Sequence, residues 1–235
     1  MTVAELDAVL FDMDGTLVDS EKVWDVGLRE LARRYGGELS LAARTRMIGT
    51  SMTESMDILH TDIAQPWRDP VASVSWLEAR VGELFAAGLV WRPGARRLLA
   101  EVRAAGIPTA LVTATRRRLV EVALRTIGES NFDLVVCGDE VAHTKPHPDP
   151  YLAAAAGLGV DVRRCVAIED SPTGVASARA AGCVVVAVPA EVALTDVANV
   201  TLVDSLEMLD VPTLRSLLAD RGRQDITDAE SNSPL

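Results

Sequence analysis

The chain has 235 residues, a hydrophobic content of 49%, a formal net charge of −11 and a pI of about 4.8. This length suits one large domain or a core with a smaller second unit. The acidic balance argues against a broad nucleic-acid surface, because phosphate backbones need clustered lysine and arginine, but it allows a small phosphorylated substrate held by one or two local cations.

Short apolar runs alternate with alanine-rich helical patterns along most of the chain. The runs have the length and composition of buried strands. Strands that alternate with helices form a parallel sheet covered on both faces, so we expect a doubly wound α/β fold. In chain order the expected elements are strand 8–11, helix 97–105, strand 107–113, helix 117–127, strand 134–136, helix 150–158, strand 165–168, helix 174–181 and strand 183–188.

A long gap separates the first expected strand from the second. One crossover needs only about a dozen residues, so the gap must hold a separate unit. Apolar residues recur there at helical spacing, as at Trp24, Leu28, Leu31 and Tyr35. We expect an all-helical insert over 18–91, a discontinuous α/β core over 1–17 and 92–220, and a polar, disordered tail over 221–235.

Carboxylate and hydroxyl side chains stand at the ends of three expected strands. Asp12 and Asp14 follow the first strand, Thr113 ends the second, and Glu169 and Asp170 follow the fourth. Ligands of open parallel sheets bind beyond the carboxyl ends of the strands. We therefore expect these side chains to meet at one edge of the sheet.

Lys145 adds an ammonium group to this edge. It lies in the segment TKPHPDP, just before an expected helix, and Lys22 is the only other lysine among the 23 basic residues. A lysine is a mobile point charge that suits phosphoryl oxygens. We expect Lys145 to bind a phosphoryl group together with the hydroxyl of Thr113 and the amide of Ala114.

The four carboxylates would repel one another if they were crowded together without a cation. Burying them unpaired would cost several kcal/mol each. Oxygen ligands without histidine or cysteine nearby favour Mg²⁺ over zinc or copper. We therefore expect Mg²⁺ at Asp12, Asp14, Glu169 and Asp170, where it would bridge enzyme and phosphate.

Asp12 and Asp14 divide the expected chemistry between them. Carboxylates form acyl-phosphates, which makes Asp12 the candidate nucleophile. Asp14 could protonate the leaving oxygen and then deprotonate the water that cleaves the intermediate. Gly15 permits the turn that lets both carboxylates face one point.

The segments DMDGTLVDSE, LVTAT, TKPHPDPY and IEDSPTG together resemble the four motifs of the haloacid dehalogenase superfamily. The helical insert resembles the cap of its β-phosphoglucomutase-like branch, and the chain is similar to sugar-phosphate phosphatases of that branch. The resemblance implies an aspartyl-phosphate on Asp12, with Asp14 as general acid and base. It implies that Asp12, the backbone carbonyl of Asp14 and Asp170 bind Mg²⁺, with Glu169 acting directly or through water. It also implies that Thr16 steadies Asp14 in its turn.

The cap differs from that of the mutases in this branch. Mutases usually carry a histidine shortly after the first motif, where this chain has Trp24, and they place a lysine and an arginine around a cap glycine. Here Ile48 precedes Gly49, and Met52 follows it. A mutase must hold a second phosphate, so these apolar residues favour a phosphatase. Glu21, Trp24, Gly49 and Met52 are the candidate substrate contacts of a cap that closes over the site.

The expected function is therefore Mg²⁺-dependent hydrolysis of a small phosphate monoester, a sugar phosphate. A phosphomutase and a non-catalytic binding or regulatory protein of the same fold stay open as alternatives. Asp14 argues against carbon–halogen and phosphonate hydrolases of this fold.

Three cysteines without CxxC spacing indicate reduced, buried thiols. The histidines His60, His143 and His147 lack ligand spacing, so we expect surface or loop-structuring roles for them. Acidic residues stand where a signal peptide carries basic ones, and no run of about 18 apolar residues occurs. We expect a cytoplasmic protein without membrane or nucleic-acid partners; the sequence sets no oligomeric state and is compatible with a monomer.

Overall fold

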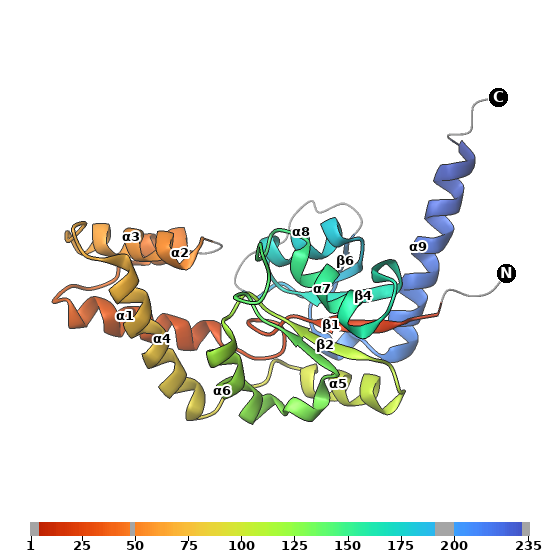
Figure 1. The fold of residues 1–235 in the computed structure, drawn as a ribbon, viewed down its shortest axis with the longest axis horizontal. Helices are drawn as coiled ribbons and strands as arrows, with labels where there is room; N and C mark the ends of the chain where they lie inside the picture. Colours follow the sequence, from red (N-terminus) through yellow and green to blue (C-terminus); the bar gives the residue numbers. More distant parts are fainter. Residues whose placement is uncertain (1–4, 48–49, 191–199, 232–235) are drawn as a thin grey trace. The chain divides into compact units, whose positions relative to one another are not determined.

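The computed structural model describes residues 5–47, 50–190 and 200–231 of the chain, with residues after 221 as backbone only. In this part of the chain, six parallel strands form one sheet in the order β3-β2-β1-β4-β5-β6 (Figure 1). The doubly wound α/β class expected from the sequence is confirmed. The strands are β1 Ala8–Phe11, β2 Thr109–Val112, β3 Leu134–Val136, β4 Cys165–Glu169, β5 Val184–Ala187 and β6 Val200–Leu202.

Strand β1 lies at the point where the chain changes direction across the sheet. The chain runs from β1 to β2 and β3 on one side, and then crosses to β4 and β5 on the other. Phe11 pairs with Leu111 of β2 and with Ile168 of β4, so the three central strands end at nearly the same level. Such a switch point is where doubly wound sheets bind their ligands, beyond the carboxyl ends of the strands.

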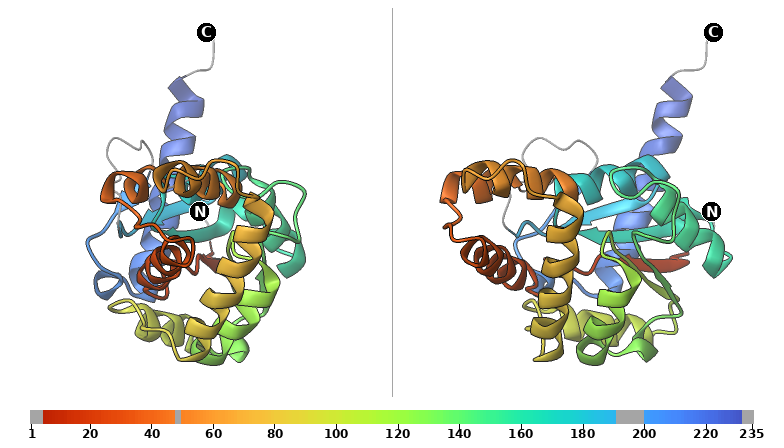
Figure 2. Two further views of the ribbon diagram at one scale, coloured as in Figure 1. Left: turned by 90° about the vertical axis from the view of Figure 1, so that its left-hand side faces the viewer. Right: turned by 60° about the vertical axis from the view of Figure 1, so that its left-hand side comes forward.

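Helices cover both faces of the sheet (Figures 1 and 2). Helices α7 (Asp149–Leu158) and α8 (Pro172–Ala181) pack against one face. Helix α9 (Val211–Ser231) contacts β4 and β5, and it also contacts α5 (Ala95–Ala104). Alanines such as Ala110, Ala154 and Ala178 are buried in the layer between the sheet and α7 and α8. Their small side chains let helix and sheet approach closely, so the strand ends are held in fixed positions.

Residue chemistry explains where α8 begins and ends. The Ser171 side chain accepts a hydrogen bond from the amide of Gly174, and Pro172 occupies the first helical position. Gly182 ends the helix in the left-handed conformation that glycine adopts without strain. The helix therefore starts directly after the segment that carries Glu169 and Asp170.

Two elements of the α/β fold differ from those expected from the sequence. Strand β6 was not predicted, because it is a three-residue edge strand with a polar residue, Thr201, at its centre. Helix α9 runs to Ser231 and so includes most of 221–235, where a disordered tail was expected. The side chains of Val211, Leu214 and Leu218 are buried at its start, and a helix that is anchored in this way propagates at little further cost. Residues 232–235 lie outside the described residues.

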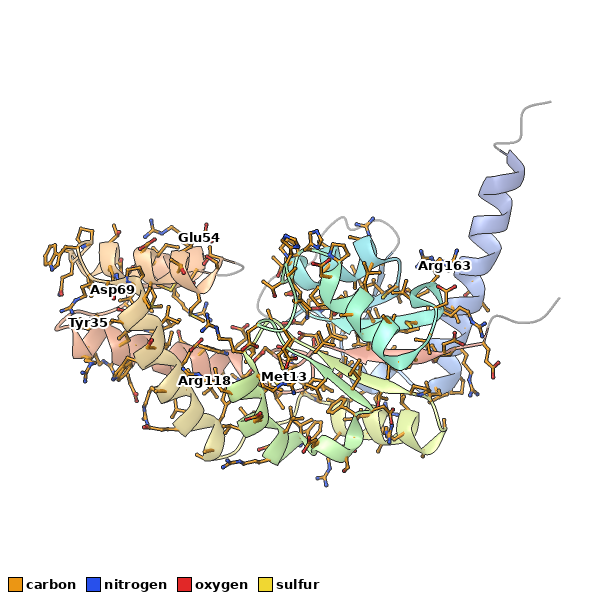
Figure 3. All side chains as sticks on the ribbon, viewed as in Figure 1. Met13, Tyr35, Glu54, Asp69, Arg118 and Arg163 are labelled. Carbon is orange, nitrogen blue, oxygen red and sulfur yellow. The ribbon has the colours of Figure 1, made fainter. Side chains whose placement is uncertain are left out.

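In its described part, the segment between β1 and α5 carries the helices α1 Glu21–Arg34, α2 Leu41–Met47, α3 Met52–Asp62 and α4 Pro70–Ala86, as expected from the sequence. Loops connect them, and isolated bridges join Val18 to Asp14 and to Trp91. Gly27 of α1 lets α4 approach closely, because a Cβ atom there would lie 2.9 Å from Leu77 Cδ1. Tyr35 Oη and Ser73 Oγ are 2.9 Å apart and join the end of α1 to α4; Figure 3 labels Tyr35 and the N-cap of α4, Asp69.

The chain divides into two compact units. One comprises 1–18, 91–117 and 128–235, and the other comprises 19–90 and 118–127. We expected helix α6 (Arg117–Ile127) to belong to the core. Its residues 118–127 group instead with the helical insert. Within that unit, Arg118 (labelled in Figure 3) donates to buried Glu78 of α4 at 2.6 Å. The boundaries between core and cap stay a prediction.

The remaining whole-chain expectations concern thiols and membranes. All three cysteines, Cys137, Cys165 and Cys183, are buried and free, as the sequence predicts. Burial raises the pKa of the Cys137 thiol to about 12. Among the described helices, none combines the length and apolarity needed to cross a bilayer.

Candidate active site

The turn after β1 brings its two aspartates to the edge of the sheet. The amide of Asp12 donates to Ile168 O at 3.0 Å and continues the pairing of β1 with β4. Met13, which stands between the two aspartates in the sequence and is labelled in Figure 3, is fully buried. Gly15 has a φ of 80°, and a Cβ atom there would lie 2.1 Å from Asp170 Oδ2. Only glycine therefore lets this turn approach the end of β4.

Lys145 ties the ends of three strands together. Its Nζ donates to Asp12 Oδ1 at 2.6 Å, to Glu169 Oε1 at 2.6 Å and to Val112 O at 2.9 Å. The side chain is only 5% exposed. An ammonium group has three N–H donors, and these three acceptors use all of them. Lys145 is thus the buried counter-ion of two carboxylates.

Burial and charge oppose each other at this ion pair. Burial raises the pKa of Asp12 to about 8, while the Lys145 ammonium acts to lower it. Burial also acts to lower the pKa of Lys145, but the carboxylates of Asp12 and Glu169 outweigh it and raise that pKa above its ordinary value. The ammonium therefore stays charged and neutralises one of the buried carboxylates.

Glu169 is held by donors on several sides. The hydroxyl of Tyr151 donates to Glu169 Oε1 at 2.6 Å, and the amide of Asp170 donates to Oε2 at 3.2 Å. A Cβ atom on Gly174 would lie 2.0 Å from the Glu169 carboxylate, so α8 approaches it closely. Tyr151 was not identified from the sequence, although it ends the quoted segment TKPHPDPY. Burial and the adjacent Glu169 raise its pKa well above the ordinary value, so it remains a donor.

The carboxylates of Asp12, Glu169 and Asp170 offer a site for a hard cation. Ligand oxygens of the three lie within 4.8 Å of one another. Asp12 Oδ2 is buried and makes no hydrogen bond within the described residues. The three carboxylates are crowded together and all their donor atoms are oxygens, which suits Mg²⁺. The residues present therefore fit the metal that the sequence predicts.

Asp14 points its carboxylate at two threonine hydroxyls. Thr115 Oγ1 donates to Asp14 Oδ2 at 2.8 Å, and Thr113 Oγ1 donates to the same oxygen at 3.2 Å. The amide of Thr115 also donates to Thr113 Oγ1 at 3.0 Å. Thr113 thus lies beside Asp14, at the edge of the sheet where the sequence predicts it. Its hydroxyl group donates its proton to Asp14. Thr115 was not identified from the sequence.

Two smaller residues of the expected site have different surroundings. Ala114 is exposed beside Thr113, and Gly138 lets the neighbouring loop reach it, because a Cβ atom there would lie 2.1 Å from Ala114 O. Thr16 is buried, and its Oγ1 makes no hydrogen bond within the described residues. Any support that Thr16 gives the turn of Asp14 therefore comes from packing.

The candidate cap residues have structural partners inside the helical unit. Glu21 pairs with Arg44 at 3.3 Å, and Trp24 packs edge-on against Phe85 with ring centroids 6.4 Å apart. Met52 begins α3 and is half-buried. Gly49 lies outside the described residues. The roles of these four residues as substrate contacts stay a prediction.

The three histidines follow the expected roles in part. His143 and His147 are exposed and structure the loop that carries Lys145. His60 is buried instead, with Nε2 2.8 Å from Ser73 Oγ. Burial lowers its pKa, so this imidazole is a neutral packing residue of the helical unit.

Comparison with known proteins places the chain among hydrolases. A family model described as haloacid dehalogenase-like hydrolase matches residues 6–182. Hexitol phosphatase B of Escherichia coli strain K12 is 31% identical over 92% of this chain and 99% of its own length. A phosphorylated carbohydrates phosphatase of Thermotoga maritima is 35% identical over 75% of this chain and 82% of its own length. A crystal structure of CbbY from Rhodobacter sphaeroides in complex with xylulose-(1,5)bisphosphate aligns with a TM-score of 0.77 and 29% identity, covering 89% of this chain and 99% of that chain.

Proposed function

Because this chain belongs to the haloacid dehalogenase-like hydrolase family, we propose that it hydrolyses a small sugar phosphate through an aspartyl-phosphate on Asp12. The observation that carries the proposal is the position of Asp12, which is buried at the switch point and held through Oδ1 by Lys145. Its Oδ2 makes no hydrogen bond within the described residues, so this carboxylate keeps an oxygen for a new bond.

We propose that Mg²⁺ is held by the carboxylates of Asp12 and Asp170 and by the backbone carbonyl of Asp14, with Glu169 acting directly or through water. The close approach of three buried carboxylates, which offer oxygen ligands alone, supports this choice of metal. When bound, Mg²⁺ neutralises charge on the phosphoryl oxygens and so lets an anionic nucleophile approach an anionic substrate.

The residues of the chain then perform two displacements. Asp12 attacks phosphorus, and the bond from phosphorus to the leaving oxygen breaks as Asp14 donates a proton to that oxygen. A water molecule next attacks the aspartyl-phosphate and gives its proton to Asp14, which releases phosphate and restores both aspartates. The hydroxyls of Thr115 and Thr113 hold the Asp14 carboxylate in position for both transfers.

Phosphate binding requires a rearrangement of donors. All three N–H groups of Lys145 have acceptors, and the hydroxyl proton of Thr113 goes to Asp14. A phosphoryl oxygen must therefore replace or share one of these acceptors. We propose that the backbone amide of Ala114, an exposed residue next to Thr113, binds the same group.

The sugar phosphate is supported by the relatives. One is named for hexitols and another for phosphorylated carbohydrates. We propose that the helical insert is the cap that selects among such substrates, with Glu21, Trp24, Gly49 and Met52 as contacts. Trp24 and Met52 favour a monophosphate over the bisphosphate intermediate of a mutase, because neither carries a positive charge to pair with a second phosphate.

The test is phosphate release from a panel of sugar phosphates, nucleotides and p-nitrophenyl phosphate, with Mg²⁺ and with chelator. We expect Mg²⁺-dependent release that is strongest on one sugar phosphate. The Asp12→Asn variant should lose turnover by roughly a thousandfold or more, because an amide is a poor nucleophile. Isomerised sugar phosphate without net phosphate release would favour a mutase. A folded protein that turns over no substrate would favour a binding protein.

A further inference from the structure

His143, His147 and Asp149 form a second cluster of ligand-type side chains on the loop before α7. The Nδ1 of His143 donates to Asp149 Oδ2 at 2.9 Å, and the Nδ1 of His147 lies 2.9 Å from Asp149 Oδ1. The imidazole rings lie side by side, with centroids 4.5 Å apart. Possible ligand atoms of the three residues lie within 4.8 Å of one another. No part of the proposed phosphatase mechanism uses these residues.

Hydrogen bonds to Thr144 and Ser177, outside the cluster, help to hold its backbone in place. The amide of His147 donates to Thr144 O at 3.0 Å, and Ser177 Oγ of α8 donates to His147 O at 2.5 Å. The amide of His143 donates to Asp149 Oδ2 at 3.2 Å, and Asp149 itself begins α7. The three side chains therefore project from fixed positions, which lowers the entropy lost when they bind a common partner.

We propose that His143, His147 and Asp149 form a surface site for a borderline transition-metal ion such as Zn²⁺, separate from the carboxylate site of Asp12. Two imidazole nitrogens and one carboxylate oxygen are the ligand set that such ions prefer, whereas Mg²⁺ prefers oxygens alone. In the metal-bound form both rings carry their proton on Nε2, so that Nδ1 is free to bind the ion.

The distances between the two imidazole Nδ1 atoms and the Asp149 oxygens need only small changes to admit a zinc ion. Nitrogen and oxygen ligands about 2.0–2.2 Å from a tetrahedral zinc ion lie somewhat more than 3 Å from one another. The two Nδ1 atoms are 2.9 Å from the Asp149 oxygens, so a slight outward movement of the rings opens the site. The His143 and His147 side chains are 66% and 48% exposed, which leaves room for this movement and for a water as fourth ligand.

The site has a direct connection to Lys145. His143 and His147 lie two residues before and two residues after it in the chain. An ion bound by both histidines would therefore cross-link the two sides of the loop that places Lys145 against Asp12 and Glu169. The site is thus a point at which a trace metal can stiffen the loop without entering the phosphatase centre.

The experiment is calorimetric titration of the full chain with ZnCl₂ in excess Mg²⁺, which occupies the carboxylate site. We expect one equivalent of Zn²⁺ to bind, and His143→Asn or His147→Asn alone to weaken binding at least about tenfold. The double variant should lose it. Asp149→Asn should weaken binding, while the matched surface variant Asp161→Asn should not. Circular dichroism checks that each variant is folded.

Cobalt provides a second readout. We expect Co²⁺ to give visible absorption bands typical of nitrogen and oxygen ligands, and the double variant to lose these bands. Zinc binding by the double variant with unchanged affinity would overturn the proposal. Absence of zinc binding to the wild-type chain would also overturn it and would leave the cluster as a hydrogen-bonded loop.

Discussion

Thr115 Oγ1 donates a hydrogen bond of 2.8 Å to Asp14 Oδ2, although the two residues are 101 positions apart in the chain. The hydroxyl of Thr113 reaches the same oxygen at 3.2 Å. Asp14 is the residue that must move a proton in both halves of the proposed reaction. Its carboxylate is therefore oriented by the segment that follows β2 as well as by its own turn.

Replacement of Thr115 by valine tests this orientation. Thr115→Val keeps the shape of the side chain but removes the shorter of the two hydrogen bonds. We expect kcat on an alkyl phosphate to fall about tenfold or more, because a misplaced acid transfers its proton less well. Hydrolysis of p-nitrophenyl phosphate should fall less, since its leaving group needs little protonation.

Thr201→Val on the edge strand β6 is the control, and it should leave both rates unchanged. An equal loss of rate on both substrates in Thr115→Val would mean that Thr115 supports the whole site rather than the acid.

The two lysines of the chain provide a matched pair for testing the buried ion pair. Lys145→Met leaves the carboxylates of Asp12 and Glu169 without their ammonium. We expect the free energy of unfolding in urea without Mg²⁺ to fall by about 3–5 kcal/mol, as for other broken buried ion pairs. Lys22 pairs with Asp19, and its side chain is 80% exposed.

Lys22→Met should therefore leave the unfolding curve unchanged. If Lys145→Met were as stable as the wild type, the buried carboxylates of Asp12 and Glu169 would not depend on the Lys145 ammonium for their stability.

The main residues of the site could be predicted because each follows a recognisable strand or motif. Asp12 and Glu169 stand next to apolar runs whose parallel pairing brings their ends to one edge, and Lys145 lies in the segment TKPHPDP before a helix. Thr115 and Tyr151 could not be placed in the same way. Their partners become neighbours only through the exact positions of the strand ends and of α7, which depend on packing that periodicity does not encode.

The same limit explains the differences in the fold. Strand β6 owes its pairing to β5 rather than to its own sequence, since three residues carry too little pattern. Helix α9 owes its start to three buried side chains spaced along 211–218, although the polar residues after it suggest an irregular end. Contacts between residues far apart in the chain accompany the grouping of 118–127 with the insert, such as the ion pair of Arg118 with Glu78, 40 positions away.

Metal binding can be measured without turnover. A ligand that binds only the folded state stabilises it, by about 2.7 kcal/mol when its concentration is about 100 times its dissociation constant. We expect Mg²⁺ to raise the unfolding midpoint of the wild-type chain, and Asp170→Asn to lose most of this shift. Asp204→Asn, which removes an exposed acid of the same unit, should retain it. A full shift in Asp170→Asn would place the metal elsewhere.

The two tyrosines of the chain separate support of the metal site from general packing. Tyr151→Phe removes the 2.6 Å hydrogen bond to Glu169 Oε1, and we expect a loss of about 1–3 kcal/mol in stability because a buried acceptor loses its donor. The dissociation constant for Mg²⁺ should also rise, since Glu169 is no longer held toward the site. Tyr35→Phe removes a comparable hydrogen bond to Ser73 in the helical unit. The Tyr35→Phe variant should lower stability without changing Mg²⁺ affinity. An unchanged Mg²⁺ affinity in Tyr151→Phe would show that Glu169 plays no part in holding the metal.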